Sequence, residues 1–353
     1  MHRGWFPETP QSLLGKQRAA GRALYPTQGG AARVDEAAPA SAPLAPQPLL
    51  PVTMAEYRGT AVLLAFFVAT MLLAVAFAAP FRTAGLQAFS DPNDVNNSLW
   101  YIGLILAFTF LILYIAKKGA KWLIRLIILG TVALTIGYVA YPLLAVTLGL
   151  APTLSYGLAG AIAVGAVAAL YWHPEWYVVD AVGLLVAAGS AAIFGISLGL
   201  VPVVVLLAGL AVYDALAVYR TKHMLSLADT VIELRLPVLL VIPKHGGYRF
   251  RADAARMQQA SATTKAQREA MFMGLGDLVM PTILVVSALQ FGQPAWGPFP
   301  ALGAALGTLA GFSVLMGYVL RGNPQAGLPL LNGGALVGFL FGVLYTTHSL
   351  VFW

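Results

Sequence analysis

Long apolar stretches, separated by short polar or basic segments, dominate the chain after residue 53. Each stretch is about 20 residues long, the length that an α-helix needs to cross the hydrocarbon core of a bilayer. The pattern therefore predicts an all-α polytopic membrane protein with about nine transmembrane helices. The predicted spans are Thr60–Ala79, Leu99–Ala116, Leu126–Leu148, Leu154–Trp172, Val178–Phe194, Leu198–Tyr219, Ala270–Leu289, Pro300–Leu320 and Leu331–Val351.

The same pattern divides the chain into four segments. Residues 1–53 are rich in Ala, Pro, Gly and Gln and have no apolar periodicity, so we expect a disordered N-terminal extension. Met54 begins a new kind of segment and is a candidate for the true start. Residues 54–219 hold the first six helices, residues 220–269 a loop, and residues 270–353 the last three helices.

The composition agrees with a membrane protein. Hydrophobic residues make up 59% of the chain and charged residues 10%, whereas soluble domains have about 25% charged residues. The absence of cysteine excludes disulfides, thiolate metal sites and a cysteine nucleophile. The net charge of +7 is not a sign of nucleic-acid binding, because the basic residues gather in a few loops beside the spans. We expect no nucleic-acid partner.

Basic residues also predict how the spans are oriented. The segment 117–125 contains four basic residues and no acid, and the loop 220–268 contains nine basic residues against three acids. Such loops remain on the cytoplasmic side of a membrane. We therefore expect a multi-pass protein of the cell membrane, with the N-terminus and the loop 220–269 in the cytoplasm and the C-terminus outside.

Two acids lie deep inside predicted spans. Asp214 is six residues before Arg220, at the cytoplasmic end of its span, and Asp277 is seven residues after the predicted start of its span at Ala270. Both are then expected about 10 Å below the cytoplasmic surface. A carboxylate at this depth costs at least a few kcal/mol, so it is a candidate for function. Asp180 and Glu269 fall at predicted span ends, where we expect their side chains to reach the interface.

Three functions are compatible with a pair of membrane-embedded acids. The acids could make separate helix contacts in a non-catalytic scaffold, or carry protons or cations in a transporter. They could also form an aspartyl-protease dyad, in which two close carboxylates share a proton. The charged carboxylate would then take a proton from water while the neutral one donates to the scissile carbonyl. The residues alone leave transport and proteolysis open, although no internal repeat of the kind found in transporters is found.

Other features narrow the chemistry. The five histidines form no His-Glu-x-x-His motif, and the chain contains no Gly-x-Ser-Gly and no phosphate-binding or dinucleotide motif. We expect no metal and no cofactor. The apolar segment Val238–Ile242 is bounded by prolines and too short to span the membrane. It fits an interfacial packing element or a strand that pairs with an unwound substrate.

Glycines recur at every fourth position in the last two spans. This spacing predicts helices that pack backbone against backbone. The glycines are Gly303, Gly307 and Gly311 in one span and Gly334, Gly338 and Gly342 in the other.

Three short motifs then follow one another along the chain: Tyr213-Asp214, Gly274-Leu275-Gly276-Asp277 and Gly327-Leu328-Pro329. They resemble the YD, GxGD and PAL signatures of the presenilin and signal-peptide-peptidase family of intramembrane aspartyl proteases. The first two match in full, whereas the third has Gly327 where the family has alanine, and Ala326 where a proline often precedes. The resemblance runs from about Thr60 to the C-terminus and looks most like the microbial, archaeal presenilin homologues.

The resemblance implies an aspartic endopeptidase that hydrolyses peptide bonds within transmembrane helices of membrane-protein or signal-peptide substrates. It implies that Asp214 and Asp277 are catalytic and that the remaining motif residues line the active site. These lining residues are Tyr213, Gly274, Leu275, Gly276, Gly327, Leu328 and Pro329. Pro329 is also expected to delay the start of the final helix. The expected partners are transmembrane polypeptide substrates and the lipid bilayer, and assembly into a homo-oligomer stays open.

Overall fold

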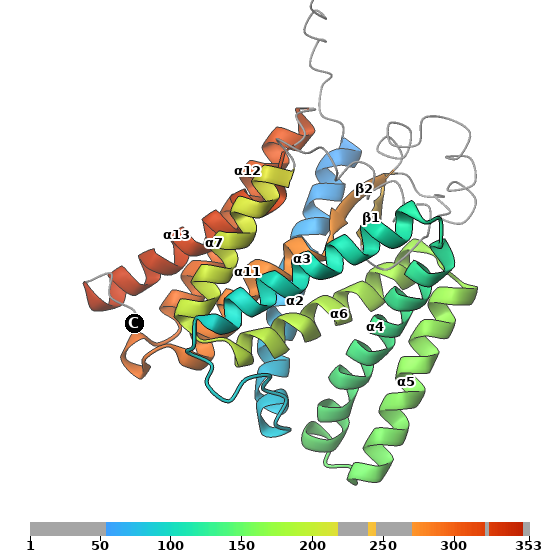
Figure 1. Ribbon diagram of the computed structural model, residues 1–353. Coiled ribbons are helices and arrows are strands. Elements are labelled where there is room, and N and C mark those ends of the chain that lie inside the picture. Colours follow the sequence, from blue (N-terminus) through green and yellow to red (C-terminus); the bar gives the residue numbers. More distant parts are fainter. Residues whose placement is uncertain (1–53, 218–238, 245–269, 322–324, 349–353) are drawn as a thin grey trace, which may run out of the picture. The chain divides into compact units, whose positions relative to one another are not determined.

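The computed structural model describes residues 54–217, 239–244, 270–321 and 325–348. The expected disordered extension and most of the loop 220–269 lie outside these ranges, as does Glu269. The described elements are α2 (Met54–Thr83), α3 (Asn96–Lys117), α4 (Lys121–Pro142), the π-helical turn η1 (Leu143–Thr147), α5 (Pro152–Trp172), α6 (Trp176–Ser197), α7 (Leu200–Leu216), β1 (Leu239–Pro243), β2 (Ala270–Gly274), α11 (Leu275–Phe291), the 3₁₀ turn η3 (Pro294–Trp296), α12 (Phe299–Leu320) and α13 (Gly327–Thr347) (Figure 1).

The helices of the described ranges follow the predicted spans in number and order. Seven of them are long and apolar enough to cross a membrane. The other two, α7 and α11, are apolar helices of 17 residues in the described ranges, and they carry Asp214 and Asp277. The main hydrophobic core is built mostly from α2, α6, α7, α11, α12, α13 and one face of both strands, with Val139 of α4 and Trp296 of η3. The prediction of an all-α polytopic membrane protein is confirmed.

The seventh span was predicted to begin too early. Ala270–Gly274 form β2, which pairs antiparallel with β1 so that Val241 lies opposite Phe272. Helix α11 begins only at Leu275, and Asp277 therefore lies in its first turn rather than two turns inside it. The reason is that a run of five apolar residues fits a buried strand and a helix equally well.

The final span was predicted to begin too late. Helix α13 begins at Gly327, so Pro329 lies inside its first turn and does not delay it. A proline is tolerated there because the amide groups of the first turn have no intrahelical acceptor to lose.

Helices α12 and α13 pack backbone against backbone, as the glycine spacing predicts. A Cβ atom added at Gly307 would lie 2.9 Å from the carbonyl carbon of Gly334, and one at Gly338 would lie 2.8 Å from that of Gly303. Real Cβ atoms essentially never approach other atoms closer than 3.0 Å, so only glycine permits this approach. The tight pair fixes the position of α13, whose first turn carries the third motif.

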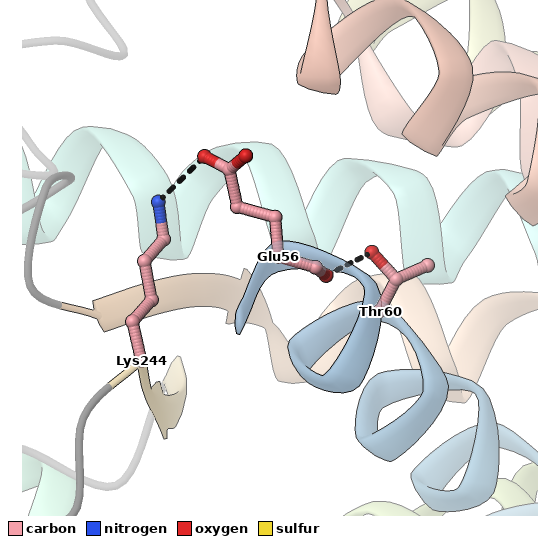
Figure 2. Close-up of polar contacts among 3 residues, drawn as sticks. All are labelled: Glu56, Thr60 and Lys244. Atoms are coloured by element: carbon pink, nitrogen blue, oxygen red, sulfur yellow. Dashed lines mark hydrogen bonds and ion pairs between the residues drawn. The ribbon is translucent and has the colours of Figure 1, made fainter. Parts of the chain in front are cut away.

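The two-stranded sheet is tied to α2 and to α6. Lys244 directly follows β1, and its Nζ lies 3.2 Å from Oε1 of Glu56 in the first turn of α2 (Figure 2). Thr60, one turn further along α2, donates its hydroxyl to the backbone oxygen of Glu56 at 2.9 Å. On α6, Oδ1 of Asp180 accepts a hydrogen bond of 2.8 Å from the backbone N–H of Val241. These contacts hold the sheet beside the start of α11.

Candidate active site

The first acid lies close to the last described turn of α7. Asp214 is 5% exposed, and its Oδ2 accepts a hydrogen bond of 3.1 Å from the backbone N–H of Leu328. Six further residues of α7 are buried along the same helix, which fixes the position of the acid within the membrane domain. Asp214 is therefore withdrawn from bulk water but has a defined polar partner.

The second acid lies where β2 turns into α11. Gly274 is the last residue of the strand and the N-cap of the helix, and Asp277 follows in the first turn. An acid in the first turn of a helix faces the partial positive charge of the helix N-terminus, which stabilises negative charge.

The third motif touches both acids. A Cβ atom on Gly327 would lie 3.2 Å from Oδ2 of Asp277, and the next residue, Leu328, donates its N–H to Asp214. Both residues belong to the first turn of α13, where backbone N–H groups are free to bind an anion. The structure therefore brings Asp214, Asp277 and the start of α13 together from three helices.

The remaining predicted residues divide into two groups. A Cβ atom on Gly276 would meet nothing within 4 Å of the described residues, so there is open space beside Gly276. A Cβ atom on Gly274 would make an ordinary contact with Oδ2 of Asp277 at 3.5 Å. Leu275 packs against α6, because a Cβ atom added at Gly183 would lie 3.2 Å from its Cδ2. Tyr213 is half-buried and its hydroxyl has no hydrogen bond within the described ranges.

Asp180 does not reach the interface, and that prediction is wrong. It is 2% exposed on α6 and accepts the N–H of Val241, while its Oδ2 has no hydrogen-bond partner among the described residues. The signal in the sequence that could have indicated a buried Asp180 was the presence of a third acid in an apolar span. Its partner is 61 positions away in the sequence, which hides the contact from sequence analysis.

Asn332 is a buried polar residue that sequence analysis missed. It lies on α13, is 0% exposed, and donates its side-chain amide to the backbone oxygen of Leu207 on α7 at 3.0 Å. It therefore links the same two helices as the bond between Leu328 and Asp214. An asparagine within an apolar span is a signal of a helix contact, although the sequence does not name its partner.

Metal ligands do not gather in the described part of the chain. No group of three or more His, Asp or Glu side chains there is placed to hold a metal ion. The chemistry available at the site is that of two neighbouring carboxylates and the amide groups of a helix N-terminus.

Comparisons with known proteins identify the family of this chain. Residues 64–348 match the family model described as signal-peptide peptidase, presenilin aspartyl protease. A solved structure of a presenilin family intramembrane aspartate protease, in space group C222, is 37% identical, with a TM-score of 0.60, over 81% of this chain and 99% of that one. A second, in space group P2, is 38% identical, with a TM-score of 0.59, over 80% and 97% of the two chains.

A comparison with curated protein sequences gave no match. The transport alternative finds no support in any of these comparisons. The family match covers most of the chain, and the solved relatives share its fold and more than a third of its aligned residues. The chain therefore belongs to the signal-peptide peptidase and presenilin family, and it is an intramembrane aspartyl protease.

Proposed function

We propose that Asp214 and Asp277 are the catalytic dyad of this protease. The observation that carries the proposal is the first turn of α13, which donates the Leu328 N–H to Asp214 and places Gly327 against Asp277. Two carboxylates held at one helix N-terminus share a single proton more readily than they carry two charges. The pair is then one acid and one base at the same point.

Peptide hydrolysis follows from this pairing. The ionised carboxylate removes a proton from a water molecule, whose oxygen forms a bond with the carbonyl carbon of the substrate. The protonated carboxylate donates its proton to the carbonyl oxygen, which gives an uncharged tetrahedral intermediate. The carboxylic acid that gained the water proton then donates it to the amide nitrogen, while the other carboxylate takes a proton from a hydroxyl of the intermediate. The C–N bond breaks, and the pair again holds one proton. The open space beside Gly276 would admit the substrate to Asp277.

The test replaces each acid by its isosteric amide. We expect Asp214→Asn and Asp277→Asn each to lower the cleavage rate of a transmembrane peptide in detergent by about a thousandfold or more, as for loss of an acid or base catalyst. Asp91→Asn is the matched control, because Asp91 is an exposed acid whose carboxylate accepts a local hydrogen bond from the backbone N–H of Asn93. Full activity in either dyad variant would refute the assignment.

We also propose that an unwound substrate segment adds as a strand to β2. The backbone N–H of Val241 points away from β2, because it donates to Asp180. The backbone groups of the neighbouring residues Leu240 and Ile242 therefore make the hydrogen bonds to β2. By the same alternation the backbone groups of Met271 and Met273 point toward β1, and those of Phe272 point toward the outer edge of β2. This edge runs directly into the turn that carries Asp277.

A proline at the outer edge tests strand addition. Phe272→Pro removes an N–H that points away from β1, so we expect lower turnover of a helical substrate while the sheet stays intact. Phe272→Ala is the matched control, since it removes the side chain but keeps the N–H. A proline at Leu240 of β1 would instead break the ladder between β1 and β2, because the backbone groups of Leu240 face β2. Equal activity of the two Phe272 variants would exclude this mode of binding.

The substrates of the protease are polypeptides within the membrane, and we propose transmembrane helices of membrane proteins and signal-peptide remnants. We further propose a cell-membrane location with the start of α2 and the loop 220–269 in the cytoplasm. The support is the excess of basic residues in the segment 117–125 and in that loop. Labelling of cysteines introduced at Glu56 and at His348 from each side of sealed vesicles tests the orientation. Labelling of both from the same side would contradict it.

A further inference from the structure

A third buried acid takes no part in the dyad. Asp180 lies on α6, 2% exposed, and only one of its two oxygens has a hydrogen-bond partner within the described ranges. Burying a carboxylate in this way is costly, whereas an apolar residue would be free of this cost. The contact that Asp180 does make, with the N–H of Val241, therefore needs a reason.

The contact closes the outer edge of β1. The outer edge of β1 is formed by the backbone groups that point away from β2, which are those of Leu239, Val241 and Pro243. Pro243 has no N–H, and the N–H of Val241 is taken by Asp180, so two of the three positions have no donor to offer to a further strand. Among the residues that the structure describes, no side chain accepts the N–H of Phe272 at the edge of β2.

The face of α6 that carries Asp180 also contacts the start of α11. A Cβ atom on Gly183, one turn after Asp180, would lie 3.2 Å from Cδ2 of Leu275 and 3.8 Å from Cδ2 of Leu240. Leu275 is the first residue of α11, two residues before Asp277. Helix α6 therefore holds β1 and the beginning of α11 on one surface.

We propose that Asp180 is a positioning residue. It locks β1 on α6 as the closed side of the sheet, and through β2 it sets the register of a substrate strand against the catalytic acids. This inference rests on the proposed function, because it takes the substrate to add to β2. The carboxylate acts as a hydrogen-bond acceptor, so its shape and one oxygen matter rather than its charge.

The experiment compares full-length variants in detergent with a transmembrane-helix peptide, measuring KM, kcat and the cleaved bonds by mass spectrometry. Asp180→Ala removes the acceptor, Asp180→Asn keeps a side-chain oxygen, and Val241→Pro removes the donor. Ser98→Ala is the matched control, because Ser98 is a buried residue whose hydroxyl bonds to the backbone of Pro202, away from the sheet. Binding of a peptidic transition-state analogue with a central hydroxyl reports the dyad in every variant.

We expect Asp180→Ala to raise KM about tenfold, the size of one lost buried hydrogen bond, and to spread cleavage over neighbouring bonds. Asp180→Asn and Ser98→Ala should stay close to the wild type. Val241→Pro should reproduce Asp180→Ala, and the double variant should be no worse than either single one, because both remove the same bond. Analogue binding should be retained throughout.

Three results would overturn the inference. The first is wild-type KM and cleavage positions in Asp180→Ala. The second is a rise in KM in Asp180→Asn as large as in Asp180→Ala. The third is a rise in KM in the double variant that equals the two single effects combined. If Asp180→Ala does not fold, Val241→Pro and Asp180→Asn still decide between these outcomes. Failure of the proposed strand addition looks different, since Phe272→Pro and Phe272→Ala would then be equally active.

Discussion

Two alanine substitutions in α13 measure how tightly α12 and α13 pack. Gly338→Ala would place its Cβ 2.8 Å from the carbonyl carbon of Gly303 and 3.0 Å from Cα of Gly307, and would overlap the Gly303 oxygen. Gly333→Ala would place its Cβ in open space, with nothing within 4 Å. The two variants therefore share the chemistry of the substitution and differ only in the space around it.

The magnitude follows from two opposing effects. Alanine in place of glycine stabilises a helix interior by about 1 kcal/mol, and this gain applies to both variants. Overpacking a close interface costs about 1–3 kcal/mol, and only Gly338→Ala has this cost. Since ordinary Cβ contacts begin near 3.4 Å and the added Cβ overlaps the Gly303 oxygen, the helices must separate by about 1 Å or more. We expect Gly338→Ala to be less stable than Gly333→Ala by about 1–3 kcal/mol.

The assay is unfolding in detergent, followed by tryptophan fluorescence, with protease activity measured on the same samples. Gly338→Ala should also lose activity, because separation of the pair shifts the first turn of α13, where Gly327 and Leu328 meet the acids. Gly333→Ala should keep it. Equal stability of the two variants, or a more stable Gly338→Ala, would refute the steric argument.

Three further predictions concern other contacts. Asn332→Asp replaces a donor by an acceptor that faces a backbone oxygen of α7, so we expect a loss of about 2 kcal/mol or more in unfolding free energy, against less than about 1 kcal/mol for Asn332→Leu. Gly327→Val should lower turnover by about a hundredfold without unfolding the protein, because its branched side chain would displace Asp277; binding of the transition-state analogue checks this. Lys244 and Glu56 are partly exposed, at 14% and 26%, so a double-mutant cycle should give a coupling below about 1 kcal/mol that salt weakens.

The sequence by itself determined the class of protein, the number and order of its helices, and the candidate acids. A transmembrane helix satisfies its own backbone hydrogen bonds, so the length and apolarity of each span are visible in the local sequence. The cost of a buried carboxylate likewise singles out Asp214 and Asp277, whatever their partners. The order of the three motifs then pointed to the family, which the comparisons confirmed.

The tertiary structure decided which of these residues meet. Leu328 reaches Asp214 across 114 positions of sequence, and Val241 reaches Asp180 across 61, distances over which local patterns say nothing. The apolar segment Ala270–Gly274 became a strand because β1 supplied a partner for its backbone, and its own five residues fit either structure. Asp180 was expected at the interface for the same reason: burial depends on what packs against a residue, and that is a property of the fold.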